Sequence, residues 1–416
     1  DVPWLEVDLN VDSEELYGPK MKRNQVFQKI IEDLDFAIQW LPEAGSEEAN
    51  RLNKDIARHV KARFCLNEGT HYKYHDELEY ASEAEKWLQM AATESDKLIT
   101  SGRYEIYNTG HPQEDYFNMY RIDDKSDLKE AVLYVDYKTN IREHNMAAAG
   151  REAGCGFSKS FVESFLCSDG LPISLSNKYL GDETMRKETA NRDPRLKQLI
   201  LTNDFPTNVT DDLKDSTFVV NEDEFITQHC FTGYRPIKGF NPIYSQALYM
   251  KSSFDGIAYR YAETLLINAE AKAELNTITN ADLDRTVNQL RDRVGMPHLT
   301  VNVGFTDPKW PDWGYSLSPV LQEIRRERCI ELAGEGFRFN DLKRWKAGKL
   351  LNNVLTYVGK RKPDGNLAIV YPNYTNPDLS YQAGKSRTWE DKMYLYPIPT
   401  GELQRNPQLL PQNPGW

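Results

Sequence analysis

The chain has 416 residues, of which 40% are hydrophobic and 27% charged, a composition typical of globular proteins with a large core. Acidic residues outnumber basic ones and give a net charge of −12. The charges are spread along the chain without a basic stripe, so we expect no nucleic acid as a partner. No apolar run approaches the roughly 20 residues of a membrane-spanning helix.

Apolar residues at helical spacing predict three helices in the first hundred residues. The first begins near Val26 and ends at Pro42, the second begins near Lys54, and the third ends at Gly102. We therefore predict an N-terminal helical part over residues 1–102.

Helical periodicity fades between residues 103 and 255. The alternating runs AVLYVDY and TFVV predict short strands, and the turn-rich stretches SDGLPIS and NRDPRL separate them. This region keeps many aromatic residues, so we predict a large irregular insert of loops and short strands rather than a linker.

Helical patterns are expected again from Gly256. One stripe of that helix carries only small side chains, which let a neighbouring helix approach closely, at Ala258, Ala262, Ala269 and Ala273. Another helix is expected between Asn280 and Gly295. Short antiparallel helix pairs predict a mainly α fold, a TPR-like scaffold of repeats of about 34 residues. Residues 256–416 form its C-terminal part and end in an extended tail.

The stretch RRERCIELAGEGFRFNDLKRW is dense in charged residues. A helix from about Ser318 places Arg328 and Glu331 on its apolar face, three residues apart. Buried charges have to be paired, so we predict a structural ion-pair network. Its members are Arg328, Glu331, Arg338, Asp341 and Arg344.

The alternative for this stretch is a catalytic pair of carboxylates, Glu331 with Glu335 or Asp341, as in glycoside hydrolases. Each of these acids has an arginine at helical spacing, which lowers the pKa of the acid. A general acid needs a raised pKa. We therefore favour the structural interpretation and expect no enzyme and no catalytic residue.

We expect no metal site and no cofactor. The histidines show no ligand spacing except His71 and His75, which we place on a loop because Gly69 precedes them. A zinc site needs three or four donors. The sequence also has no glycine pattern of a nucleotide-binding loop.

Several motifs occur in the order found in a known family. They are RNQVFQKIIEDLDFAIQWLP, RLNKDIARHVKARFCLNEG, SDGLPIS, DPRL, TGYRPIKGF, RYAETLLINAEA, NQLRDRVGMP, EIRRERCIELAGEGFRFNDLKRW and the closing YPIP and NPQLLPQNPGW. Over essentially its whole length the chain resembles the SusD/RagB family, which comprises glycan-binding outer-membrane lipoproteins of Bacteroidetes. The resemblance implies a SusD-like fold with the irregular insert on a TPR-like scaffold.

The resemblance also implies a function. We expect a non-catalytic protein on the cell surface that binds a polysaccharide or oligosaccharide and delivers it to a TonB-dependent, SusC-like outer-membrane transporter. Family members begin with a lipidated cysteine and a first helix pair before a segment like GDVPW, so we expect this chain, which begins at Asp1, to lack that N-terminal repeat and the lipid anchor. We expect a membrane contact only through that anchor.

A competing function stays open, namely a TPR-type scaffold that binds a peptide or protein. Such a scaffold predicts a concave groove lined with Asn, Lys and Arg side chains.

Two loops are candidates for glycan binding, because sugar rings need flat aromatic faces and polar partners for their hydroxyls. The loop DPKWPDWGY offers Trp310, Trp313 and Tyr315 between two helices. The alternative is that these rings anchor the loop on its neighbours. The other candidate is the insert loop that carries Arg142, His144, Asn145 and Arg151.

Overall fold

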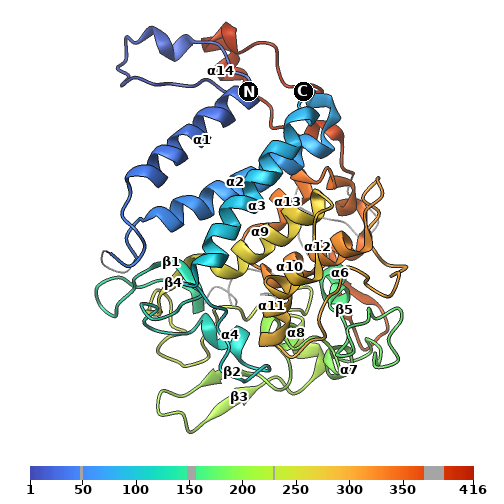
Figure 1. Cartoon of the computed structure of the whole chain (residues 1–416). Helices are drawn as coiled ribbons and strands as arrows, with labels where there is room; N and C mark the ends of the chain where they lie inside the picture. The colour runs from blue at the N-terminus through green and yellow to red at the C-terminus, as the bar shows by residue number, and fades with distance from the viewer. Residues whose placement is uncertain (47–49, 148–155, 228–229, 370–387) are drawn as a thin grey trace.

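Helices of the N-terminal and C-terminal parts pack on one another, and the insert lies below them in the view of Figure 1. The computed structural model describes residues 1–46, 50–147, 156–227, 230–369 and 388–416. The helices are α1 (Arg23–Trp40), α2 (Lys54–Tyr74), α3 (Ala84–Ser101), α4 (Asp115–Met119), α6 (Lys159–Ser164), α7 (Met185–Thr189), α8 (Arg195–Leu199), α9 (Tyr261–Glu274), α10 (Asn280–Asp284), α11 (Val287–Arg293), α12 (Pro319–Glu331), α13 (Arg338–Arg344) and α14 (Thr400–Arg405).

Strands in the described ranges are short and pair two by two, all antiparallel. The pairs are β1 (Ala131–Val135) with β4 (Gly256–Arg260), β2 (Pro206–Val209) with β3 (Ser216–Phe218), and β5 (Val358–Arg361) with β6 (Leu367–Ile369). The prediction of a mainly α fold with an insert of loops and short strands is confirmed.

The first three helices lie where the sequence predicts them. Asn53 caps α2, because its side chain accepts hydrogen bonds from the backbone N–H groups of Asp55 and Ile56. α3 ends at Gly102, whose φ of +67° is the left-handed conformation that glycine adopts without strain. Both ends follow from capping chemistry visible in the sequence.

The prediction of a loop at His71 is wrong. Gly69 and His71 lie inside α2, which runs to Tyr74. A side chain at Gly69 would come within about 2.9 Å of the side chain of Leu88 on α3. Glycine is therefore needed here for the close approach of two helices rather than for a turn.

The predicted helix start at Gly256 is also wrong. Residues 256–260 form β4, which pairs with β1 of the insert, and α9 begins at Tyr261. Ala258 is exposed on this strand, whereas Ala262, Ala269 and Ala273 are buried in α9 as the stripe predicts. Pairing with β1 gives residues 256, 257, 259 and 260 backbone partners in a strand, so this segment does not need a helix to find them.

The helix expected between Asn280 and Gly295 is broken in two. Thr286 separates α10 from α11 with a non-helical backbone, and its hydroxyl donates to the carbonyl oxygen of Asp282. Thr279 caps α10 and forms a capping box with Asp282. The backbone N–H of Thr286 bonds to the carbonyl oxygen of Leu283, three residues earlier, so the chain tightens at this point and does not continue as one α-helix.

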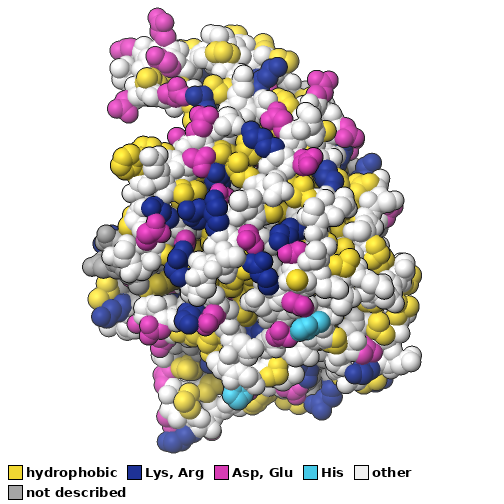
Figure 2. Space-filling model, viewed as in Figure 1, with side chains coloured by type: hydrophobic (Ala, Val, Ile, Leu, Met, Phe, Trp, Pro, Cys, Tyr) yellow, Lys and Arg dark blue, Asp and Glu magenta, His cyan; other side chains and the backbone are white. Residues whose placement is uncertain are grey.

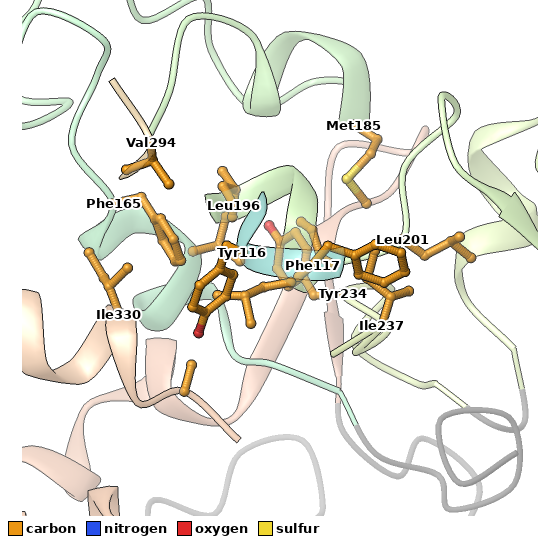
Figure 3. Packing of buried hydrophobic residues seen from close by; sticks show 14 of the residues in the cluster. Tyr116, Phe117, Phe165, Met185, Leu196, Leu201, Tyr234, Ile237, Val294 and Ile330 are labelled. Atoms are coloured by element: carbon orange, nitrogen blue, oxygen red, sulfur yellow. The ribbon is translucent and has the colours of Figure 1, made fainter. Parts of the chain in front are cut away.

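Three of the buried clusters hold the parts together. One joins α1, α2, α3 and α9, and a second joins α9, α11 and α12. Figure 3 shows the third, in which insert residues such as Tyr116, Phe165 and Leu196 meet Val294 and Ile330 from the C-terminal part. The insert is thus packed on the scaffold through a core of its own. None of the helices in the described ranges is both long and apolar enough to cross a membrane.

Candidate functional site

Glu331 occupies the charged centre of the molecule. Its carboxylate is fully buried and accepts hydrogen bonds from Arg293, Arg260 and Arg195, at N–O distances of 2.6, 2.6 and 3.0 Å. These arginines come from α11, the end of β4 and α8. One carboxylate therefore joins the insert to the C-terminal helices.

The electrostatics of this centre oppose a general acid. Burial alone would raise the pKa of Glu331, but Arg293, Arg260 and Arg195 outweigh it and hold the pKa well below the usual range. For Glu335, burial is likewise outweighed by Arg260 and Lys238, and its pKa is lowered. Both carboxylates are therefore ionised at neutral pH.

The ion pairs differ in detail from those predicted. Arg328 does not pair with Glu331; its Nε donates to Asp341 at 2.9 Å, because the chain turns back after Gly334 and brings α13 beside α12. Asp341 also accepts from Nε of Arg344 at 2.9 Å. Helical spacing finds neighbours on one helix, but it does not show the partner that a second helix supplies.

Arg338 is a further correction. It is exposed, and its guanidinium carbon lies 6.0 Å from the centroid of the Trp345 ring. Arg338 is the first residue of α13. The charged side chains that this helix buries, Asp341 and Arg344, lie about one and two turns further along it.

A groove of about 1150 Å³ lies beside these ion pairs. Its walls come from α1, α2, α9, β4, the turn between α12 and α13, and several residues of the insert. Asn67, Arg63 and Lys238 line it, and so do acids that pair with the basic groups, for example Glu335 at 2.6 Å from Lys238. Burial lowers the pKa of Lys238 to about 8, although Glu335 opposes this shift. Figure 2 shows both signs of charge interspersed over one face of the molecule.

The tryptophan loop lies against the helices. Trp313 is only 6% exposed; its indole N–H donates to Gln322, and its ring meets Trp345 edge to face. Trp310 is half-buried and donates to Glu323 at 2.7 Å. This geometry favours the loop-anchor alternative, because a sugar needs an accessible ring face.

Tyr315 is held in the same way. Its hydroxyl donates to the carbonyl oxygen of Trp345 at 2.5 Å, and its ring stacks on Tyr74 with centroids 4.4 Å apart. One ring face is therefore covered by α2.

The insert loop is more open. Arg142 is exposed, with its guanidinium carbon 4.9 Å from the centroid of the Tyr137 ring. His144 is half-buried; its Nε2 donates to the carbonyl oxygen of Phe254, and its Nδ1 accepts from the backbone of Met146. Both ring nitrogens of His144 are thus used by the backbone. Arg151 lies outside the described residues.

A second segment, residues 243–252, lies beside this loop. The sequence analysis did not identify it as a candidate site. Asn145 accepts a hydrogen bond from the backbone of Met250 at 3.1 Å, and His144 forms an antiparallel bridge with Ser252. The segment carries two exposed tyrosines, Tyr244 and Tyr249. The run YSQALYM gave no sign of an exposed site, because Tyr244, Ala247 and Leu248 have the spacing of an ordinary buried helix face.

A helical-repeat scaffold with an irregular insert packed on it is the architecture of a known class of proteins. The family model of the SusD family matches residues 94–416, and the chain belongs to this family. A curated relative is SusD-like protein P2 of Formosa agariphila, with 24% identity over 429 residues that cover 100% of this chain and 70% of the relative.

Solved structures share the fold. A SusD-like protein from Bacteroides fragilis superposes with a TM-score of 0.71 at 24% identity, covering 100% of this chain and 75% of that one. A SusD-like carbohydrate-binding protein from the same species gives a TM-score of 0.67 at 22% identity, covering 98% and 75%.

Proposed function

We propose that this protein binds a polysaccharide or oligosaccharide at the cell surface, without cleaving it, and delivers it to a TonB-dependent, SusC-like outer-membrane transporter. Membership of the SusD family is the observation that carries this proposal. A relative with the same fold is described as a carbohydrate-binding protein. The surface location and the lipid anchor are carried over from the family resemblance.

The charged centre supports binding without catalysis. Retaining and inverting glycosidases need one carboxyl group that stays protonated near neutral pH. Arginine partners lower the pKa of Glu331, and a lysine and an arginine do the same for Glu335. Both groups are therefore poor proton donors.

We place the glycan on the insert loop rather than on the tryptophan loop. Arg142 is exposed and Asn145 is half-buried, so both side chains can reach a ligand from solvent. The indole N–H groups of Trp310 and Trp313 are bonded to α12, and one face of Tyr315 is stacked on Tyr74. Trp310, Trp313 and Tyr315 are the secondary candidates for glycan contact.

A binding assay and a cleavage assay together test this proposal. The chain is run in native gels that contain starch, xylan, galactomannan, pectin or alginate, and the same polysaccharides are checked for new reducing ends. We expect retardation by at least one polysaccharide and no new ends. Cleavage that disappears in a Glu331→Gln variant would overturn the non-catalytic part, and pull-down with the transporter tests the delivery step.

The groove favours a second candidate, a TPR-type scaffold that binds a peptide. Asn67, Arg63 and Lys238 line a concave space between helices, as such a scaffold requires. A peptide ligand would bind equally well in the presence and in the absence of the five polysaccharides. Lys238→Ala, which removes a groove cation, would then weaken peptide binding and leave glycan binding unchanged.

A further inference from the structure

Exposed apolar side chains gather where the insert loop meets the segment 243–252. A large apolar side chain in water is unfavourable, and a cluster of them marks a binding surface more often than a single one does. The cluster comprises Ile141, Met146, Tyr244, Leu248, Tyr249 and Met250. We call it the tyrosine patch.

Two backbone connections hold the loop and the segment side by side. His144 and Ser252 exchange both backbone hydrogen bonds, at 2.9 and 3.1 Å. The side chains of Glu143 and Lys251 form an ion pair of 3.1 Å beside them. These bonds place residues 143–145 beside residues 250–252, although about 100 residues separate them in sequence.

The segment is also fixed from its other side. The backbone N–H of Tyr244 donates to the carbonyl oxygen of Val209, and that of Ser245 donates to Asp211. Ala247 is buried and anchors the middle of the segment. Met250 has a φ of +55°, a left-handed turn that ends the run of apolar residues. The backbone is thus ordered while the rings face solvent.

Tyr249 is 70% exposed and Tyr244 is 52% exposed. No ring contact involves either side chain within the described ranges. A tyrosine offers a flat apolar face with a hydroxyl at its edge, which matches a sugar ring that has C–H groups on one face and hydroxyls around it. A ring that is already positioned loses little entropy when a ligand stacks on it.

We infer that Tyr249 and Tyr244 form the aromatic stacking site for sugar rings of the bound glycan, with Arg142 and Asn145 beside them as polar partners. This inference rests on the proposed function and adds the surface at which it operates. Asn145 lies close to Tyr249 because it accepts a hydrogen bond from the backbone of Met250, the next residue, and Arg142 belongs to the same loop.

Matched control residues are available in the same chain. Tyr396 in the C-terminal tail is 70% exposed, like Tyr249, and Tyr17 near the N-terminus is 51% exposed, close to Tyr244. Figure 1 shows both termini at the end of the molecule opposite β2 and β3. The segment 243–252 is tied to β2 by the bond between Tyr244 and Val209. Alanine at each control position removes the same ring from another surface.

The test is affinity electrophoresis of the 416-residue chain in gels with starch, xylan, galactomannan, pectin or alginate, with thermal melting beside it. For the polysaccharide that retards the wild-type protein, Tyr249→Ala should raise the apparent Kd by roughly three- to tenfold and Tyr244→Ala by roughly two- to fivefold, since each removes apolar burial against one sugar face. Tyr249→Phe should keep most of the affinity. Tyr396→Ala and Tyr17→Ala should leave the affinity unchanged.

Three outcomes count against the inference in different ways. Wild-type affinity in both Tyr249→Ala and Tyr244→Ala would overturn the stacking site and leave the proposed function standing. If no polysaccharide retards the wild-type protein, the proposed function falls, and the inference falls with it. Variants that keep glycan affinity but lose cross-linking to the transporter would assign the tyrosine patch to that partner.

Discussion

Two regions of the molecule depart from the usual placement of side chains, which keeps charges on the surface and large rings in the core. They are the interior around Glu331 and the tyrosine patch. Glu331 is a charge in the core, and Tyr249 is a large ring in solvent. The charge is compensated by three arginines within 3.0 Å, whereas the ring has no stacking partner within the described ranges. A buried charge that is paired explains how the molecule is held together. An exposed ring without a stacking partner indicates where a second molecule binds.

The same contrast separates the two aromatic loops. The indole of Trp313 donates to Gln322 and its ring packs on Trp345, so this loop is part of the assembly of α12 and α13. More than half of the surface of Tyr244 and of Tyr249 is exposed and does not pack against the rest of the fold. Abundance of aromatic residues is thus a poor guide to a binding site, and exposure is a better one.

The largest expected effect is the loss of the central carboxylate. Glu331→Ala leaves three buried guanidinium groups around an empty position, which should reduce the free energy of unfolding by about 3–5 kcal/mol. Denaturant unfolding followed by circular dichroism measures it. The matched control is Glu183→Ala, which removes one partner of the exposed pair with Lys187 and should cost less than about 1 kcal/mol. Equal effects would mean that burial does not set the strength of these pairs.

The second effect is the loss of a buried ring. Trp313→Ala removes a ring that packs on Trp345 and should reduce the free energy of unfolding by about 3 kcal/mol. The affinity for the retarding polysaccharide should not change. Thermal melting and affinity electrophoresis on the same sample separate the two readouts. A loss of affinity with an unchanged melting temperature would restore the tryptophan loop as the glycan site.

Much of the scaffold could be predicted from the sequence because its signals are local. Capping by Asn53 and the left-handed glycine at Gly102 follow from chemistry within one turn of the chain. The strand at residues 256–260 could not be predicted, because its partner is β1, more than 100 residues earlier. The role of Gly69 likewise depends on Leu88 of another helix.

The candidate site was harder to predict for the same reason. Sequence spacing correctly placed Arg328 and Glu331 on a buried face, but their partners come from α13, α11, β4 and α8. Tyr249 carries no local signal, because the exposure of its side chain depends on how distant segments pack. Charge on an apolar face can be recognised in a sequence; a ring left uncovered cannot.

The third effect is a pH dependence of stability from a second buried acid, Glu263. Burial would raise its pKa, but His59 and Arg63 outweigh it and lower the pKa to about 2. The unfolded chain has a pKa near 4.5, so folding binds fewer protons, and this stabilisation is complete above pH 5 and lost as the pH falls towards 2. It amounts to roughly 3 kcal/mol.

Unfolding of the wild-type protein and of Glu263→Gln at several pH values checks this sign. The amide does not titrate, so the difference in unfolding free energy between the two proteins should be largest at pH 7 and should shrink between pH 5 and pH 2. A difference that stays constant with pH would show that the pKa of Glu263 is not lowered in the folded protein.

The smallest expected effect on stability concerns the polar side of the tyrosine patch. Arg142 is exposed and lies over the ring of Tyr137, an exposed contact worth roughly 0.5–1 kcal/mol. Arg142→Ala should therefore lower the melting temperature by no more than a few degrees. It should weaken glycan binding by roughly two- to fivefold, because it removes an exposed hydrogen-bond donor from the loop that we assign to the glycan. Lys138→Ala is the control, since Lys138 is an exposed cation whose backbone pairs with Arg142.

If both variants weaken binding equally, the loop attracts its ligand by general charge, and raising the salt concentration should abolish the difference from the wild-type protein. If only Arg142→Ala weakens binding, and does so at high salt as well, the guanidinium makes a directed contact with the sugar.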